Sequence, residues 1–335
     1  MILVTGGTGL VGSHLLISLT ETNDSVRAIY RKNSDLNAVK RIFDYGAKSP
    51  SKQFLKIEWV TANLNDISAL GAAFEGVHKV YHCAAFIDFD PNNYYKLKKT
   101  NVEGTANVVN FCLANAVEKL CYVSTIAVLG TQTSTKEYSE KTNWNPEAKN
   151  SVYAITKYGA EMEVWRGSQE GLDVVVVQPG VILGEGFYNS GSGEIVKLAA
   201  KGMSFYTSGS IGVVDVKDVV NIMKQLMTGT FTNEAYLLVN ENITYRNLGT
   251  KLAVRFNKKP PKFPIAKWVL MFLSKIESLV SFLFGVKRKF PKALVDSMYE
   301  SPRYTNTKVK RDLELSFTPL DQTIERIAKH YSMES

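Results

Sequence analysis

The sequence is poor in cysteine and has no cysteine pattern typical of a metal site. Cys83, Cys112 and Cys121 are an odd number, lie in apolar runs and lack the spacing of metal ligands. Buried, reduced thiols are the expected state of such cysteines, as in a cytoplasmic protein. We therefore expect cytoplasmic localisation and no metal site.

A long apolar run free of charges is also missing. Residues 265–286 are strongly apolar, but Lys267, Lys275 and Glu277 interrupt them. A membrane-spanning helix needs about 20 apolar residues with few charges, so we expect no integral membrane span. Because the first predicted strand begins at Ile2, we also expect no signal peptide ahead of it.

Acidic residues are scarce in one part of the chain. The net charge is +8, yet residues 251–311 alone carry +12, because 15 Lys and Arg face only Glu277, Asp296 and Glu300. A basic segment can bind nucleic acid, an anionic membrane surface or an anionic substrate. No nucleic-acid-binding motif accompanies it, so we expect no nucleic-acid partner.

A glycine-rich segment organises the start of the chain. The apolar run Ile2–Thr5 leads into Gly6-Gly7-Thr8-Gly9-Leu10-Val11-Gly12, and Leu15, Leu16 and Leu19 follow at helical spacing. Strand, glycine turn and helix form the context of a dinucleotide-binding fingerprint. The helix start offers free N–H groups to a pyrophosphate, although a glycine turn in another α/β protein is the alternative. The predicted cofactor-binding residues here are Gly6, Thr8, Gly9, Leu10, Val11 and Gly12.

Strands and helices alternate over the first 180 residues. Predicted strands at 26–30, 57–60, 79–83, 119–123 and 174–177 are separated by helical patterns at 35–45, 67–74 and 96–114. This alternation predicts an α/β fold, a Rossmann-type doubly wound parallel sheet with a smaller C-terminal substrate lobe. Residues 1–180, with 211–240 returning, would form the cofactor domain, and 181–210 and 241–335 the substrate-binding lobe.

The end of the second predicted strand is basic. NAD-binding units usually place an acidic residue about 20 residues past the glycines, where it binds the ribose 2′-OH. Here Arg31 and Lys32 occupy that region and could pair with a 2′-phosphate instead. NADP(H) is therefore favoured, with NAD(H) as the alternative if the two cations are merely solvated. At the end of the fourth predicted strand, the small residues Ala84 and Ala85 leave space for a flat cofactor.

Tyr153 and Lys157 have the spacing of an acid–base pair. Four residues apart in a helical pattern, they lie on one face, one turn apart. A free tyrosine titrates near pH ~10, and a neighbouring ammonium is expected to lower that pKa. Such a tyrosine can donate a proton to a carbonyl oxygen or accept one from an alcohol. Ser124 and Thr125, at the end of the fifth predicted strand, could hydrogen-bond the same oxygen, unless they only cap the strand.

Several segments together resemble one known family. They are TGGTGLVG at 5–12, HCAA at 82–85, NVEGT at 101–105, VSTIAVLG at 123–130, YAITK at 153–157, QPGVILGEG at 178–186, VVDVKDV at 213–219 and the ending at 304–313. The chain resembles an extended short-chain dehydrogenase/reductase, the family that includes nucleotide-sugar epimerases and dehydratases, over nearly its whole length.

The resemblance implies roles for individual residues. Thr125 matches the substrate-orienting hydroxyl, Tyr153 the acid–base, and Lys157 the residue that also holds the nicotinamide ribose. Asn101 resembles the asparagine that supports the active-site helix and proton relay. Further cofactor contacts are implied at Asn63 and Leu64, on the adenine, and at Pro179 and Val181, beside the nicotinamide. Family members often dimerise through paired helices, so a homodimer is also implied as an option.

Departures from the family pattern narrow the function. Asn63 stands where an Asp is usual, and Gln178 stands where an Arg is usual. Ile126 and Ala127 replace the Asp-Glu pair of sugar dehydratases, and Gly180 or Val181 stands where sugar epimerases have Asn. The chain looks closer to the dihydroflavonol reductase and hydroxysteroid dehydrogenase branch.

We therefore expect an NAD(P)H-dependent oxidoreductase that reduces a carbonyl, or oxidises the alcohol, of a small and apolar substrate. An NAD-dependent nucleotide-sugar epimerase is the alternative, and a non-catalytic cofactor-binding scaffold is a weaker one. The sequence does not name the substrate.

The apolar segment 265–289 is predicted to contain a helix with one apolar stripe. Packing against the substrate lobe is the ordinary explanation of such a stripe. The apolar stripe extends further around the helix than one packing contact needs. We therefore expect the helix to form the apolar wall of a substrate pocket, with peripheral membrane contact as the less favoured alternative. The stripe consists of Trp268, Val269, Phe272, Ile276, Leu279, Val280 and Leu283.

Overall fold

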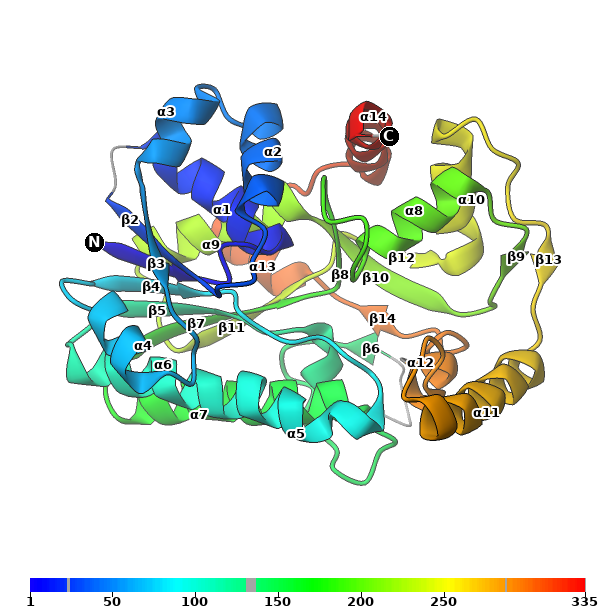
Figure 1. Cartoon of the computed structure of the whole chain (residues 1–335), viewed down its shortest axis with the longest axis horizontal. Helices are drawn as coiled ribbons and strands as arrows, with labels where there is room; N and C mark the ends of the chain where they lie inside the picture. The colour runs from blue at the N-terminus through cyan, green and yellow to red at the C-terminus, as the bar shows by residue number, and fades with distance from the viewer. Residues whose placement is uncertain (23–24, 131–136, 287, 335) are drawn as a thin grey trace.

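The computed structural model describes residues 1–22, 25–130, 137–286 and 288–334. Its centre is a seven-stranded parallel sheet with the order β3-β2-β1-β4-β5-β7-β11 (Figure 1). The strands are β1 (Ile2–Thr5), β2 (Val26–Tyr30), β3 (Ile57–Thr61), β4 (Lys79–His82), β5 (Lys119–Val123), β7 (Asp173–Pro179) and β11 (Glu234–Leu238).

Helices cover both faces of this sheet, each over its own apolar core (Figure 1). One face carries α1 (Leu10–Glu21), α2 (Leu36–Gly46), α3 (Pro50–Leu55) and α9 (Val216–Thr228). The other face carries α4 (Ile67–Ala73), α6 (Gly104–Ala114) and α7 (Val152–Gln169). The central strands are buried on both sides, as their continuous apolar sequences require. The predicted Rossmann-type, doubly wound α/β fold is confirmed.

Side-chain caps fix where several helices begin. The Asp35 side chain accepts from the Ala38 N–H ahead of α2, and Asp66 accepts from Ala69 ahead of α4. Ser151 accepts from the Ala154 N–H ahead of α7. Each cap satisfies an N–H group that the helix itself leaves without a partner. The Ser151 cap sets the register that brings Tyr153 and Lys157 to the site.

A smaller lobe is built on a second, three-stranded sheet. In it β10 (Ser210–Asp215) pairs in parallel with β8 (Val181–Leu183) and antiparallel with β12 (Glu241–Thr244). The lobe's core packs this sheet against α8 (Gly193–Lys201), α10 (Tyr245–Arg255) and α14 (Leu320–Glu334). The exact division of the chain into a cofactor domain and a substrate lobe stays a prediction, although β11 does pair with β7 of the main sheet.

Shorter elements complete the chain. Two-residue strands pair β9 (Phe205–Tyr206) with β13 (Phe263–Pro264), and β6 (Glu137–Tyr138) with β14 (Arg303–Tyr304). The 3₁₀ turns span Pro91–Asn93 and Ile126–Val128, and the short helices are α12 (Lys292–Ser297) and α13 (Thr307–Leu313). The single helix predicted over 96–114 is instead α5 (Tyr94–Leu97), a π-helical turn at Lys98–Glu103, and α6.

The predicted apolar helix is α11 (Lys267–Phe284), and its stripe does not pack on the lobe. Trp268 is 72% exposed, Phe272 59% and Leu279 61%, whereas Leu270 and Ser274 are buried. The expected burial of the stripe, and with it the apolar wall of a substrate pocket, is therefore wrong. Over the residues described, no helix is long and apolar enough to cross a membrane.

Candidate active site

The site lies at the edge of the main sheet where all the parallel strands end. Strand order reverses between β1 and β4, because the chain runs outward through β2 and β3 and then returns to continue from β4. Open α/β sheets bind ligands at such a switch point, outside the carboxyl ends of the strands. The segments that follow β1, β4 and β5 therefore converge there (Figure 1).

The glycine turn after β1 is shaped by two kinds of close contact. Gly6 has φ +71°, and a Cβ on it would lie 2.6 Å from the Ala84 nitrogen. A Cβ on Gly12 would lie 2.2 Å from the Gly6 carbonyl oxygen, so only glycine lets α1 start this close to the turn. Gly9 differs, because its Cβ would meet nothing closer than 3.5 Å. The space beside Gly9 is open to a ligand, and a Cβ at this position would partly fill it. We call this space the glycine cradle.

The helix that follows this cradle begins without a side-chain cap among the described residues. Gly9 is the N-cap of α1, and a glycine has no side chain to accept from the first N–H groups. The N–H groups at the start of a helix have no partner within it, and the helix dipole is positive there. Leu10 and Val11 thus offer donors to an anion, and the predicted set from Gly6 to Gly12 forms one continuous turn.

The end of β2 lies beside the same turn. The Thr8 hydroxyl lies 3.4 Å from the Ser34 hydroxyl, and the Arg31 N–H donates to that Ser34 oxygen at 3.2 Å. Arg31 and Lys32 are exposed, and neither has a carboxylate partner among the described residues. Ser34 was missed by sequence reasoning, although its position three residues after Arg31 is the signal that could have found it.

The end of β3 carries the predicted adenine turn. The Asn63 side-chain oxygen accepts from the Asn65 N–H at 3.2 Å, and the Asn107 amide donates to the Leu64 carbonyl at 2.9 Å. Leu64 packs on Gly104, where a Cβ would lie 2.9 Å away. Asn63 is exposed beside the end of β3, while Leu64 is buried.

The end of β4 is held by a buried histidine. His82 lies 2.6 Å from the Thr5 hydroxyl through Nδ1 and 2.9 Å from the Thr105 hydroxyl through Nε2. Burial, with a smaller effect of Lys157, lowers the pKa of His82 to about 3, so the ring is neutral. The Ala84 N–H donates to the same Thr5 oxygen, and Ala85 is exposed at the edge of the sheet.

Asn101 lies in the π-helical turn and clamps the loop after β4. Its Oδ1 accepts from the Phe86 N–H at 2.8 Å, and its Nδ2 donates to the Phe86 carbonyl at 3.0 Å. The same Nδ2 donates to the Thr156 hydroxyl on α7 at 3.2 Å, and that hydroxyl donates to the Tyr153 carbonyl. Asn101 therefore ties the loop to the helix that carries Tyr153.

Tyr153 meets Thr125 at the end of β5. The Thr125 hydroxyl lies beside the Tyr153 phenol, and the ring of Phe89 lies 5.5 Å from that of Tyr153 in an edge contact. Loss of solvent contact raises the pKa of Tyr153 to about 12, and the neighbouring Thr125 hydroxyl opposes this rise only in part. The expectation that Lys157 lowers this pKa does not hold in this structure.

Lys157 is fully buried and donates elsewhere. Its Nζ donates to the Tyr122 hydroxyl at 2.6 Å and to the Val123 carbonyl at 2.8 Å. Burial lowers the pKa of Lys157 to about 7, although Glu161 and Cys83 act in the opposite direction. Lys157 is therefore poised between its two charge states near neutral pH.

Ser124 belongs to a buried network behind Tyr153 and Thr125. Its hydroxyl donates to the Glu161 carboxylate at 2.5 Å. Gln178 donates to both oxygens of the same carboxylate, at 3.0 and 3.2 Å, and the Trp165 indole donates at 3.3 Å. Sequence reasoning missed Glu161, although Tyr153, Lys157 and Glu161 follow one another at steps of four along α7.

The segment after β7 completes the edge. Pro179 is the last residue of β7 and is buried, and Val181 begins β8 and is partly exposed. Between them, a Cβ on Gly180 would lie 2.4 Å from the Gly212 carbonyl oxygen, so the chain crosses tightly from the main sheet to the second sheet. Pro179 and Val181 thus follow the strand next to β5.

Comparison with known proteins decides the family. The model of the NAD dependent epimerase/dehydratase family matches residues 2–238. The chain belongs to this family.

Individual members of the family are similar over nearly the whole chain. A protein of Synechocystis sp. named putative dihydroflavonol 4-reductase is 26% identical, over 96% of this chain and 91% of that protein. Sterol demethylase protein B of Methylococcus capsulatus is 26% identical, over 92% of this chain and 89% of that protein. The structure of UDP-glucose 4-epimerase from Thermus thermophilus, in complex with NAD, is 18% identical and superposes with a TM-score of 0.75, covering 99% and 98% of the two chains.

Membership in the epimerase/dehydratase family supports a nicotinamide dinucleotide cofactor and an NAD(P)-dependent enzyme of the extended short-chain dehydrogenase/reductase type. The glycine cradle and the uncapped start of α1 fit such a cofactor, because both present backbone N–H groups where a pyrophosphate needs them. Residues predicted to contact the cofactor lie after β1, β2, β3 and β4 and at the end of β7, all at the carboxyl edge of the sheet.

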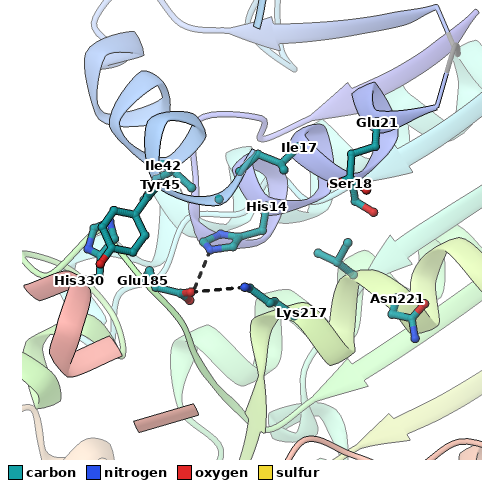
Figure 2. Close-up of a pocket in the computed structure, with 12 residues that line it drawn as sticks. His14, Ile17, Ser18, Glu21, Ile42, Tyr45, Glu185, Lys217, Asn221 and His330 are labelled. Atoms are coloured by element: carbon teal, nitrogen blue, oxygen red, sulfur yellow. Dashed lines mark ion pairs between the residues drawn. The ribbon is translucent and has the colours of Figure 1, made fainter. Parts of the chain in front are cut away.

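A cavity of about 200 Å³ lies apart from this edge, between α1, α2, α9 and α14 (Figure 2). Glu185 points into it, 3.7 Å from His14 Nε2 and 3.8 Å from Lys217 Nζ, and it also pairs with Arg326. Burial opposes ionisation, yet His14 and Arg326 hold the pKa of Glu185 well below its usual range. Because Glu185 pairs with His14 on α1 and with Arg326 on α14, it links these two helices. Arg326 also pairs with Asp215.

Proposed function

We propose that the chain is an NADP(H)-dependent oxidoreductase that reduces the carbonyl, or oxidises the corresponding alcohol, of a small apolar substrate. The observation that carries this proposal is the position of Tyr153 beside the Thr125 hydroxyl at the carboxyl end of β5. A phenol placed there, with Lys157 one turn along α7, would be a proton donor at the edge where the cofactor would lie.

The proton step follows from the state of Tyr153. With a pKa of about 12, the phenol is protonated at neutral pH and can donate to a carbonyl oxygen. The cofactor, when bound, supplies or accepts the hydride. In reduction the carbonyl carbon gains that hydride while its oxygen gains the Tyr153 proton, which gives the alcohol. Thr125 would donate to the same oxygen and stabilise the developing negative charge.

Two other residues, Lys157 and Asn101, would support this step without giving up a proton to the substrate. Lys157, one turn along α7 from Tyr153, would hold the nicotinamide ribose. Asn101 would keep the loop after β4 in place against α7 through Phe86 and Thr156. Ser124 donates to Glu161, so we assign the substrate hydroxyl contact to Thr125 rather than to Ser124.

The choice of NADP(H) rests on the end of β2. Arg31 and Lys32 are exposed there beside the Thr8–Ser34 contact, and the acidic residue typical of NAD-binding units is missing. A guanidinium can bind a phosphate with two parallel hydrogen bonds, which a ribose hydroxyl cannot match. Adenine contacts at Asn63 and Leu64 and nicotinamide contacts at Ala84, Ala85, Pro179 and Val181 complete the proposed cofactor site.

The apolar character of the substrate is inferred from the side chains next to Tyr153. Phe89 packs on its ring, and Phe86 lies on the same loop. The names of the two relatives, a dihydroflavonol reductase and a sterol demethylase protein, agree with ring-containing, weakly polar ligands. Residues 181–210 and 241–335 would form the lobe that selects the substrate.

A screen of apolar aldehydes and ketones with NADPH tests the proposal. We expect net oxidation of NADPH with some of them, weaker activity with NADH, and no activity for the Tyr153→Phe variant. A nucleotide-sugar epimerase would instead keep NAD through purification, interconvert UDP-sugars and consume no NADPH. That outcome, or activity that survives Tyr153→Phe, would overturn the proposal.

A further inference from the structure

Helix α11 is amphipathic with its apolar side turned outward. Four strongly exposed apolar side chains, Trp268, Phe272, Leu279 and Leu283, lie on one face of the helix. Ile276 and Phe282 flank this face and are also exposed, at 44% and 85%. We call these six residues the α11 face. Large exposed apolar surfaces are uncommon on proteins without a partner and mark a contact with another molecule or a membrane.

The inner side of the same helix contains the buried Leu270 together with several polar side chains. Ser274 is buried, and Ser278 and Ser281 are partly buried. Glu277 accepts from the Lys289 N–H at 3.0 Å and from the Phe290 N–H at 2.8 Å. These contacts anchor the helix to the segment that follows it and fix which side points outward. The packing of α11 on the rest of the chain therefore determines that its apolar side faces outward.

Exposed lysines lie before, within and after α11 in the sequence. Lys258, Lys259 and Lys262 precede the helix, Lys275 lies within it, and Lys289 and Lys292 follow it; all six are exposed. Lys267, by contrast, pairs with Asp296. Among the described residues, no carboxylate lies within ion-pair distance of any of the six.

We propose that the α11 face docks the protein on an anionic phospholipid surface. An apolar helix face enters the boundary between headgroups and acyl chains, while surrounding lysines bind the anionic headgroups. Lys275 can extend its charged end toward the headgroups while its stem stays in the apolar layer. This proposal goes beyond the proposed enzyme activity and does not depend on it.

A second copy of the chain fits the same face less well. A two-fold interface through α11 would place the same patch of each copy against its mate, and so would bring the two sets of unpaired lysines together. Like charges facing each other across an interface oppose association. An anionic bilayer instead complements both the apolar side chains and the lysines.

The docked surface also adjoins the candidate active site. Arg288, just beyond α11, lies 3.8 Å from Asp90, and the neighbouring Phe89 packs on Tyr153. Figure 1 shows α11 with α12 at the outer edge of the molecule, below β9 and β13. Phe205 on β9 and Phe263 on β13 are also more than half exposed, and their ring centroids are 6.0 Å apart. A bilayer at the α11 face would therefore lie near the loop that borders Tyr153.

Co-sedimentation of the full chain with vesicles tests the proposal. We expect binding to vesicles of equimolar phosphatidylcholine and phosphatidylserine, weaker binding to phosphatidylcholine alone, and weakening by salt. Phe272→Gln and Leu279→Gln should each lower the partition coefficient about tenfold or more, since each removes the burial of one large apolar side chain. Lys275→Glu combined with Lys289→Glu should weaken binding to the anionic vesicles alone.

Matched controls separate docking from a general effect of polarity. Leu55, on α3, is 82% exposed, so Leu55→Gln makes the same exchange elsewhere and should leave binding unchanged. Trp268 gives a second readout, because its fluorescence should shift to shorter wavelength on vesicle binding, and Trp268→Phe should abolish that shift.

Three results would overturn the proposal. One is a wild-type protein that stays in the supernatant with both kinds of vesicle at low salt. Another is binding that Phe272→Gln and Leu279→Gln leave unchanged. The last is a dimer in sedimentation velocity that Leu279→Gln dissociates, which would assign the α11 face to a second copy of the chain.

Discussion

Helices α7 and α11 both have 18 residues, and both depart from the usual pattern of apolar inside and polar outside. Helix α7 buries Lys157 and Glu161, and α11 exposes Trp268, Phe272 and Leu279. On α7 the buried charges have partners, since Lys157 donates to Tyr122 and Glu161 accepts from Ser124 and Gln178. On α11 the apolar side chains face solvent. The first departure serves chemistry inside the molecule, and the second points to a contact outside it.

The largest expected effect is the loss of turnover when the proton donor of α7 is removed. Tyr153→Phe deletes one hydroxyl and should lower kcat by roughly 10²–10⁴-fold, the usual contribution of a positioned proton donor. Cofactor affinity and the circular dichroism spectrum should stay close to wild type, because the phenol is not part of the core. Single-turnover kinetics on a confirmed substrate measure the effect. Near wild-type turnover would remove Tyr153 from the mechanism.

A second prediction compares two leucines of α11. Leu270 is 6% exposed and Leu279 is 61% exposed. Leu270→Ala should cost about 2–5 kcal/mol of unfolding free energy, because it leaves a cavity. Leu279→Ala should change the unfolding free energy by about 0.5 kcal/mol or less, as a surface substitution. Urea denaturation of both variants checks this, and equal costs would mean that both faces of α11 are packed.

The cofactor preference should depend on Arg31. Arg31→Ala should weaken NADP(H) binding by roughly ten- to hundredfold, the value of one charge-assisted hydrogen bond. NAD(H) binding should hardly change, because that cofactor has no 2′-phosphate. Titration calorimetry measures the dissociation constants of both cofactors. Lys217→Ala is the control variant, because it removes an exposed cation beside the separate cavity and should change neither constant. Equal weakening for both cofactors, or for neither, would contradict the assignment and favour the NAD-dependent epimerase.

The smallest effect is a shift in pH dependence through Glu161. Lys157, with a pKa of about 7, loses its positive charge as the pH rises through that value, and Glu161 raises this pKa. If the charged form holds the nicotinamide ribose, kcat/KM should fall above neutral pH. In Glu161→Gln that fall should begin at lower pH, because the carboxylate that favours the ammonium is gone. Trp165→Phe removes another contact of Glu161 but keeps its charge, so its profile should match wild type.

Much of the fold could be predicted from the sequence, because its signals are local. Alternating apolar strands and helical patterns indicated the parallel sheet, and the helix predicted at 35–45 is α2 (Leu36–Gly46). The π-helical turn at Lys98–Glu103 was not predicted, since one inserted residue in a helix leaves the apolar periodicity almost intact. Periodicity also shows that α11 has an apolar face, but it does not show whether that face points inward.

The candidate site could be predicted only in part, because local sequence signals place residues at an edge of the sheet but do not show which side chains meet. Sequence position predicts that Thr125 and Tyr153 lie at the same edge, and the structure places the two side chains beside each other. Adjacent residues on an extended segment point to opposite sides, so sequence alone did not separate Ser124, which donates to Glu161, from Thr125. The direction of the Tyr153 pKa was missed because the spacing to Lys157 does not show that Nζ is taken up by Tyr122 and Val123.

Isotope transfer tests the central claim most directly. NADPH carrying deuterium at the transferring carbon would be incubated with the wild-type protein and an apolar ketone found in the screen. We expect an alcohol with deuterium on the former carbonyl carbon, formed at the same rate as NADPH is oxidised. The Tyr153→Phe variant should not form this alcohol. An alcohol without deuterium, or deuterated alcohol formed at an undiminished rate by Tyr153→Phe, would contradict this claim.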